Sequence, residues 1–252
     1  MNANTQNNAN KVAIVTGSSR GIGAAIAKRL AADGVAVIVN YAGRKADADA
    51  VVAEIQNAGG RAAAFQADVS SPAEVAAMFD QAITLFGGVD ILVNNAGIIQ
   101  PGLTQLADTD DALFDRLVSI NLKGTFNTLR VAAKKLRQGG RIVNFSSSVK
   151  ALALPGYSIY AATKAAVETM TNIFAKELRG RNITVNAVAP GPTATDLFLK
   201  DKTPQQIEHL AKMPPMERLA QPEDIANVVA FLVGPDGAWV DGQTLRANGG
   251  IV

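Results

Sequence analysis

Two residues four positions apart carry the chemistry of a proton-transfer pair. Tyr160 and Lys164 lie in a segment with a helical pattern, so both side chains project from one face of the predicted helix. A phenol titrates near about 10 and is a poor acid at neutral pH. Because a neighbouring ammonium favours the phenolate, we expect Lys164 to lower the pKa of Tyr160, so that the phenol can exchange a proton with a substrate oxygen. Ser147 follows an apolar run thirteen positions before the tyrosine and offers a hydroxyl to the same oxygen.

A Tyr-x-x-x-Lys pair by itself indicates no more than a helix with an ordinary surface lysine. A second motif changes that interpretation. The segment 16–23, Thr-Gly-Ser-Ser-Arg-Gly-Ile-Gly, lies between the apolar run 12–15 and a helical pattern that begins at residue 21. Glycines there permit a tight turn and the close approach of a pyrophosphate, and the helix N-terminus presents free N–H groups to it. The segment therefore predicts a dinucleotide site.

Apolar strand-like runs alternate with helical patterns along the chain from residue 11. This alternation predicts an α/β fold, a single-domain Rossmann doubly wound parallel sheet of seven strands with helices on both faces. The ligand crevice of such a sheet lies at the carboxyl ends of the strands. The predicted strands are 11–16, 35–41, 61–67, 89–94, 141–146, 182–188 and 243–247. The predicted helices are 21–33, 46–58, 72–86, 105–137, 157–179 and 222–233.

The domain organisation follows from the same pattern. Residues 1–10 are polar and lack the basic and apolar regions of a signal peptide, so they predict a flexible leader to one domain at 11–252. The segment 190–221 is rich in proline and has a short helical pattern near 204–212. We expect it to form a lid over the substrate, with a purely structural crossover as the alternative.

Five motifs in this order resemble those of the short-chain dehydrogenase/reductase family, over essentially the whole chain from about residue 11. The glycine turn matches the family's T-G-x-x-x-G-x-G, residues 94–97 match its N-N-A-G, and Pro190-Gly191 matches its turn after the sixth strand. The resemblance implies a catalytic tetrad of Asn121, Ser147, Tyr160 and Lys164. It also selects Ser147 from three consecutive serines. In the family Lys164 would bind the nicotinamide ribose, and Asn121 would bind a water that links Lys164 to solvent. For Asn121, an amide that bonds within a helix is the alternative.

The resemblance also implies which residues contact the cofactor. Asp68 and Val69 resemble the family's adenine-contacting pair, although Asp68 could equally belong to the N-cap region of the next helix. The implied set comprises Gly17, Ser19, Arg20, Gly21, Ile22, Gly23, Asn40, Tyr41, Arg44, Asp68, Val69, Asn95, Ala96, Gly97, Tyr160, Lys164, Pro190, Gly191 and Thr193.

The residue that ends the second strand predicts the choice of cofactor. An acidic side chain there binds the adenosine ribose diol of NAD and repels the 2′-phosphate of NADP. The neutral Asn40 occupies this place, and no carboxylate follows before Asp47. Arg20, inside the glycine turn, is placed to bind the phosphate, as a basic residue does in NADP-preferring relatives. Arg44 or Lys45 offers a second cation. We therefore expect NADP(H), unless these cations are merely solvated surface charges.

The substrate side of the pocket is predicted from the segments 98–104, 148–157 and 192–213, which contribute large apolar side chains and few candidates for binding an anion. The expected substrate contacts are Ile98, Leu154, Tyr157, Leu197 and Phe198. Such a lining favours reduction of a hydrophobic or aromatic ketone to a secondary alcohol. Reduction of a 3-oxoacyl thioester of an acyl carrier protein or coenzyme A is the alternative, with Lys150, Lys200 or Lys202 facing the carrier. A non-catalytic NADP-binding regulator is a third possibility, and it would show a broken tetrad.

Composition excludes several other classes of function. The 252 residues have a formal net charge of +2 and no basic block, so nucleic-acid or membrane-surface binding has no support. Cysteine is absent, and His209, the single histidine, has no partner at a metal-ligand spacing, so we expect no metal site. We expect a cytoplasmic protein. The resemblance implies a homotetramer that assembles through 105–137, 157–179 and the C-terminal strand region.

Overall fold

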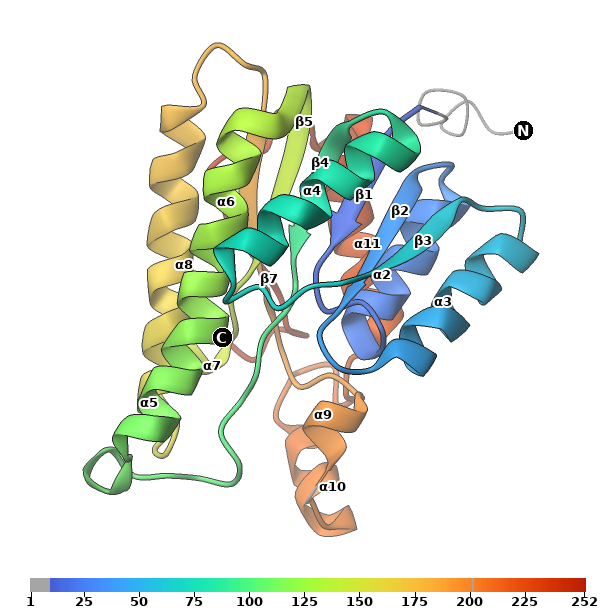
Figure 1. The fold of residues 1–252 in the computed structure, drawn as a ribbon. Coiled ribbons are helices and arrows are strands. Elements are labelled where there is room, and N and C mark those ends of the chain that lie inside the picture. The colour runs from blue at the N-terminus through green and yellow to red at the C-terminus, as the bar shows by residue number, and fades with distance from the viewer. Residues whose placement is uncertain (1–9, 201) are drawn as a thin grey trace.

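The computed structural model describes residues 10–200 and 202–252, and in these residues seven parallel strands form one sheet in the order β3-β2-β1-β4-β5-β6-β7 (Figure 1). The strands are β1 (Val12–Val15), β2 (Ala36–Tyr41), β3 (Ala62–Gln66), β4 (Val89–Asn94), β5 (Leu136–Phe145), β6 (Thr184–Pro190) and β7 (Thr244–Ala247). The predicted fold class and all seven predicted strands are confirmed. Of the predicted leader, only Asn10 falls within the described residues.

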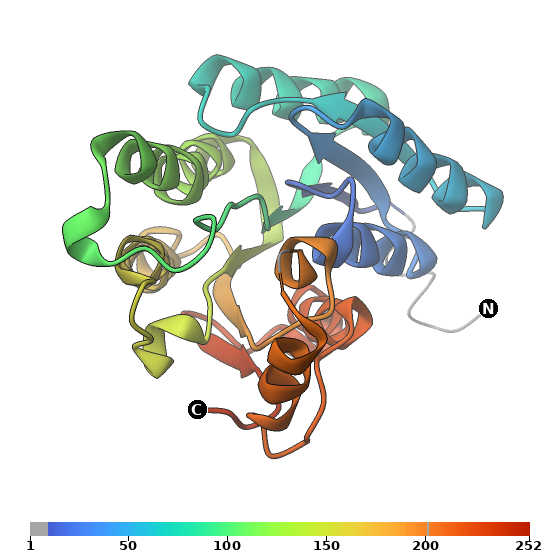
Figure 2. The same cartoon turned by 90° about the horizontal axis from the view of Figure 1, so that it is seen from below.

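Helices cover both faces of the sheet because alternate residues of the central strands point to opposite sides. Ala13 and Val15 of β1 belong to one buried cluster, whereas Val12 and Ile14 belong to the other. The first face carries α2 (Gly21–Ala32), α3 (Lys45–Asn57) and α11 (Pro222–Val233) (Figure 2). The second carries α4 (Pro72–Phe86), α6 (Gly124–Lys135) and α8 (Ser158–Glu177). Fully apolar strands in the sequence thus correspond to a sheet buried on both sides.

The predicted helix 105–137 is several elements in the structure. A 3₁₀ turn, η1 (Leu106–Asp108), precedes α5 (Asp111–Leu117), a π-helical turn η2 (Val118–Lys123) and α6. The helix begins late because Asp110 is the N-cap of α5 and accepts a hydrogen bond from the Leu113 N–H (2.7 Å). It ends at Lys135 because the chain turns directly into β5, which starts five residues earlier than predicted and shifts register against β4.

The segment 190–221 leaves the sheet at the carboxyl ends of the strands and carries α9 (Asp196–Leu199) and α10 (Pro204–Lys212), which extend below the sheet (Figure 1). Thr203 forms a capping box with Gln206, and Pro204 follows it at the first helical position, so α10 begins where the sequence pattern predicted. A Cβ atom at Gly249 would lie 3.0 Å from Pro214 Cβ, so the C-terminal segment packs against the end of this excursion. Within the described residues, no helix is both long and apolar enough to span a bilayer.

Candidate active site

The glycine turn joins β1 to α2 with a backbone that needs glycine. Gly17 and Gly21 have φ angles of 62° and 56°, in the left-handed region. Gly23 lies so close to its neighbours that a Cβ atom would be 2.5 Å from Asn95 Nδ2. No side chain caps the N-terminus of α2, so the first N–H groups of this helix are available to a ligand.

Thr16 and Asn95 bind the glycine turn to the end of β4. The Thr16 hydroxyl accepts hydrogen bonds from the N–H groups of Asn95 (3.1 Å) and Ala96 (3.0 Å). The Asn95 side chain donates to the carbonyl groups of Thr16 (2.9 Å) and Gly17 (3.0 Å). The predicted cofactor residues of the two motifs are therefore brought together at the point where the strand order reverses.

Asn40 was expected to end the second strand, where it would face the adenosine ribose. In the structure its side chain instead lies beneath the glycine turn. Its Oδ1 accepts the Gly17 N–H (3.0 Å), and its Nδ2 donates to the carbonyl groups of Ala67 (3.0 Å) and Phe65 (3.3 Å). β2 extends one residue further, to Tyr41, and the Asn40 side chain is buried. The Asn40 amide therefore stabilises the glycine turn, because both of its polar atoms already bind backbone groups.

Asp68 and Val69 follow β3 and hold its turn to neighbouring helices. Asp68 Oδ1 accepts hydrogen bonds from the N–H and the hydroxyl of Ser70, both 2.8 Å. The Val69 carbonyl accepts a hydrogen bond from the Asn127 side chain of α6 (2.9 Å). The N-cap of α4 is Ser71, so the alternative in which Asp68 belongs to the N-cap region is partly correct.

The three cations near the expected 2′-phosphate site differ in their partners. Within residues 10–200 and 202–252, the Arg20 side chain makes no hydrogen bond or ion pair. Arg44 lies 3.3 Å from Asp47, and Lys45 lies 2.6 Å from Asp49, in exposed ion pairs of α3 and its N-cap. Arg20 is therefore the cation of this group that is free to bind an anion.

Ser147, Tyr160 and Lys164 come together at the carboxyl end of β5. The Ser147 hydroxyl lies beside the Tyr160 phenol, where it lowers the pKa of that phenol. Lys164 Nζ donates to the Phe145 carbonyl (2.9 Å) and lies 5.6 Å from the centre of the Tyr160 ring. A Cβ atom at Gly97 would be 3.6 Å from Lys164 Nζ, so the N-N-A-G segment approaches the same cluster.

Asn121, the fourth tetrad residue, sits in the π-helical turn η2 and is almost completely buried. Its side chain accepts the Ile98 N–H (2.8 Å) and donates to the Ile98 carbonyl (2.9 Å). The Asn121 carbonyl accepts the Thr125 hydroxyl (3.0 Å). The Asn121 side-chain amide therefore holds the segment after β4 in place. It does not form hydrogen bonds within its own helix, as the alternative interpretation would require.

Burial governs the protonation of the cluster. Burial raises the pKa of Tyr160, and Tyr157 acts in the same direction, whereas the hydrogen bond with Ser147 lowers that pKa. The expectation that Lys164 lowers the pKa of Tyr160 below its usual value is therefore wrong for this structure, because loss of water around the phenol has the larger effect. Burial also lowers the pKa of Lys164 to about 8, and an ammonium with this pKa is still mostly protonated at pH 7.

Gln100 is a residue of the substrate side that the sequence analysis missed. It is buried, and its Nε2 donates to the Gly156 carbonyl (2.7 Å), next to Tyr157. The ring of Tyr157 packs edge-on against that of Tyr160, with centroids 6.4 Å apart. Both rings and Gln100 line one small cavity. The available signal was a long polar side chain directly after two isoleucines in the segment 98–104.

The remaining predicted residues lie on three segments around this cluster. Ile98 is on the segment after β4, and Leu154 follows the short helix α7 (Val149–Leu152). Phe198 is in α9, where its ring stacks with the Lys202 ammonium at 4.4 Å. Leu197 is in the same helix, but its side chain falls outside the described part of the chain. The expected role of Leu197 and Phe198 in substrate binding stays a prediction.

Pro190 is the last residue of β6, and Gly191 and Thr193 follow it. The Pro190 carbonyl accepts the Ser148 N–H (3.0 Å), and a Cβ atom at Gly191 would lie 2.8 Å from Asn248 Cα. The turn therefore packs between the serine loop and the C-terminal segment.

Comparisons with known proteins agree with this geometry. The family model described as Enoyl-(Acyl carrier protein) reductase matches residues 17–252. The NADPH-dependent aldehyde reductase-like protein, chloroplastic, of Arabidopsis thaliana is 47% identical over 256 residues, which cover 97% of this chain and 95% of the relative. A short chain dehydrogenase from Burkholderia cenocepacia J2315 in complex with NADP aligns with a TM-score of 0.90 and 42% identity, over 96% of this chain and 98% of its own. The angucycline C-6 ketoreductase LanV with bound NADP aligns with a TM-score of 0.90 and 36% identity, over 96% and 95%.

The chain belongs to the short-chain dehydrogenase/reductase family of oxidoreductases. The resemblance drawn from the sequence motifs is thereby confirmed.

Proposed function

We propose that this protein is an NADPH-dependent reductase that converts a ketone to a secondary alcohol, with Tyr160 as the proton donor. The observation that carries the proposal is the proximity of Ser147, Tyr160 and the buried Lys164 to one another and to the Asn-Asn-Ala-Gly segment beside the glycine turn. The relatives described as an NADPH-dependent aldehyde reductase-like protein and as a ketoreductase with bound NADP support the same chemistry. A regulator without catalysis is disfavoured because all four tetrad positions are filled.

The residues present fit NADP(H). The uncapped N-terminus of α2 offers N–H groups to a pyrophosphate, and Arg20 offers a guanidinium that has no hydrogen-bond or ion-pair partner in the described residues. NADPH, when bound, supplies the hydride that the carbonyl carbon receives. Ser147 donates a hydrogen bond to the carbonyl oxygen, and Tyr160 donates the proton. The Lys164 ammonium then stabilises the phenolate, and by family resemblance it also binds the ribose next to the nicotinamide.

Preference for NADPH over NADH rests on Arg20. A guanidinium binds a phosphate with paired, charge-assisted hydrogen bonds. Arg44 and Lys45 are already paired with Asp47 and Asp49, so they contribute less. The test is to compare kcat/KM for the two cofactors. A ratio of about tenfold or more in favour of NADPH supports the assignment, and an equal or reversed ratio contradicts it.

The substrate is an apolar ketone, aliphatic or aromatic. NADPH oxidation against aryl ketones, diketones, quinones, β-keto esters and 3-oxoacyl thioesters distinguishes this proposal from its alternative. Lys150, one of the lysines expected to face an acyl carrier protein, is paired with Glu168 and is less available for that role. Activity confined to 3-oxoacyl thioesters would replace the ketone proposal.

The segment 190–221 acts as a lid, and the protein assembles as a homotetramer in the cytoplasm. The start of this segment lies over the glycine turn, since a Cβ atom at Gly21 would be 3.4 Å from Thr195 Cγ2. Phe126 of α6 and Ile173 of α8 are about half exposed, and Trp239 before β7 is 98% exposed, which supports association through these regions. Light scattering that gives the mass of a monomer at micromolar concentration would contradict the tetramer.

A further inference from the structure

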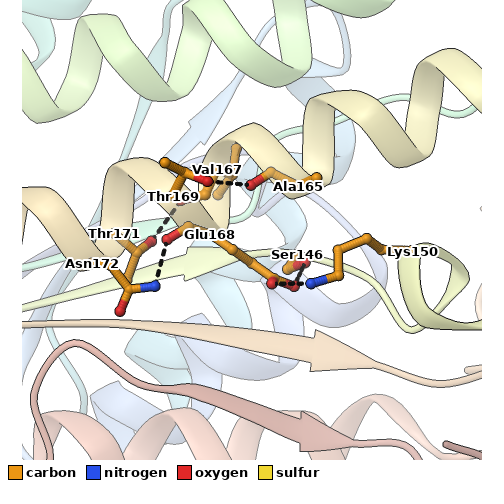
Figure 3. A network of polar contacts seen from close by, with 8 residues as sticks. All are labelled: Ser146, Lys150, Ala165, Val167, Glu168, Thr169, Thr171 and Asn172. Atoms are coloured by element: carbon orange, nitrogen blue, oxygen red, sulfur yellow. Dashed lines mark hydrogen bonds and ion pairs between the residues drawn. The ribbon is translucent and has the colours of Figure 1, made fainter.

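α8 carries a third polar residue in line with Tyr160 and Lys164. Glu168 follows Lys164 by four positions and Tyr160 by eight, so it lies two turns along the same face of the helix. Its Oε1 accepts the Ser146 hydroxyl (2.6 Å), and its Oε2 lies 2.5 Å from the Lys150 ammonium (Figure 3). The side chain is 15% exposed, and the Ser146 side chain is buried.

The two donors that Glu168 binds lie on either side of Ser147. Ser146 immediately precedes it at the end of β5, and Lys150 follows it by three residues in α7. One carboxylate therefore holds both ends of the short loop that carries the Ser147 hydroxyl. Both contacts are charge-assisted, which makes them stronger and more directional than neutral hydrogen bonds.

Ser148 holds the other side of this loop to the sheet. Its N–H donates to the Pro190 carbonyl (3.0 Å), and its hydroxyl donates to the Ala189 carbonyl (3.3 Å) and accepts from Asn248 Nδ2 (3.1 Å). Ser147 thus lies between an attachment to β6 and an attachment to α8. The attachment to α8 is the one that sets its position relative to Tyr160, because Tyr160 and Glu168 belong to the same rigid helix.

We propose that Glu168 is a positioning residue, which holds the Ser147 hydroxyl beside the Tyr160 phenol. This inference rests on the proposed function, in which both hydroxyl groups bond to the substrate oxygen. Glu168 takes no part in proton transfer, since both of its oxygens are engaged by Ser146 and Lys150. A displacement of about 1 Å at a reacting group can lower a rate by roughly 100-fold, so the loss of this attachment lowers turnover.

The first test is a set of single variants. Glu168→Ala lowers kcat by about 10- to 100-fold, while the Kd for NADPH, followed by nucleotide fluorescence, changes by less than about twofold. Glu168→Gln keeps an acceptor for Ser146 and recovers part of the lost kcat. Glu177→Ala is the matched control, because Glu177 is an exposed carboxylate in the last turn of the same helix, and its kcat stays normal.

The decisive test is a double-mutant cycle with Ser147→Ala. If Glu168 acts through Ser147, Glu168→Ala lowers kcat in the wild-type background and has little further effect when Ser147 is already alanine. An equal loss in both backgrounds, or no loss in either, overturns the inference. If Ser147→Ala itself keeps full activity, the proposed function fails instead.

A conservative substitution at the partner residue protects the test against misfolding. Ser146→Ala removes only the hydroxyl that Glu168 binds, and circular dichroism confirms that the variant is folded. Its kcat loss is expected to vanish in the Ser147→Ala background, as for Glu168→Ala. A Ser146→Ala enzyme with normal kcat overturns the inference as well.

Discussion

Replacing Lys164 with methionine is expected to abolish activity and yet stabilise the ligand-free protein. Lys164 is 5% exposed, and burial lowers its pKa from 10.5 to about 8. A shift of this size corresponds to about 3 kcal/mol by which folding disfavours the charged form at neutral pH. Methionine has a similar length and no charge, so Lys164→Met removes this penalty.

The lost hydrogen bond to the Phe145 carbonyl offsets part of the gain. It contributes about 1 kcal/mol, which leaves Lys164→Met more stable than the wild type by about 2 kcal/mol at pH 7. For a chain of this size, that gain raises Tm by about 4–8 °C. The assay is thermal unfolding of both proteins at one concentration, without cofactor.

The pH dependence gives a stricter check. The folded pKa of Lys164 lies below its unfolded value, so the unfolded chain binds more protons, and the wild type gains stability as pH rises from about 8 towards 10.5. Lys164→Met lacks this group, so its advantage shrinks by about 2 kcal/mol between pH 7 and pH 9.5. A variant that melts below the wild type at pH 7, or a difference that does not change with pH, would refute the reasoning.

Three further substitutions test the site. Tyr160→Phe lowers kcat by about 10²- to 10⁴-fold with normal NADPH affinity, because it removes the proton donor. Tyr157→Phe is the matched control, and a larger loss of kcat in that variant would show that Tyr157, not Tyr160, donates the proton. Arg20→Ala reduces the NADPH/NADH ratio of kcat/KM by about tenfold, and an unchanged ratio would place the phosphate elsewhere. Asn40→Asp lowers Tm by several degrees and does not change the cofactor preference to NADH, because a carboxylate would face the carbonyl groups of Phe65 and Ala67. A stable variant that prefers NADH would contradict this.

The fold could be predicted because its strands are continuous apolar runs. β1 and β2 are buried on both faces, and the sequence shows this directly, since all four residues of β1 and the first four of β2 are aliphatic. The break of the predicted helix 105–137 was less visible, because apolar periodicity continues through the π-helical turn. An N-cap such as Asp110 is recognisable only once its hydrogen bond to Leu113 is known.

The structure brings together residues that the sequence predicted to meet, but the sequence did not show which partner each side chain binds. Three consecutive serines look alike in sequence, but in the structure the hydroxyl of Ser146 binds Glu168 and that of Ser148 binds Ala189. Asn40 shows that the direction of a side chain is also hard to predict from sequence. It was expected to end the second strand, but β2 continues to Tyr41, and the direction of the Asn40 side chain depends on backbone groups that are distant in sequence.

The π-helical turn at Asn121 affects which sequence changes this segment can accept during evolution. A π turn holds one more residue than an α-helical turn over about the same rotation, so the extra residue mainly changes the side-chain directions within the turn itself. Deleting a single residue between Val118 and Lys123, other than Asn121, would restore an α-helix, keep the faces of α5 and α6 and turn the Asn121 side chain away from its present direction. Asn121 would then lose Ile98, although every side chain of the tetrad would still be encoded. Insertions and deletions in this stretch are therefore expected to be far more damaging than most substitutions, and variant libraries scored for activity would detect the difference.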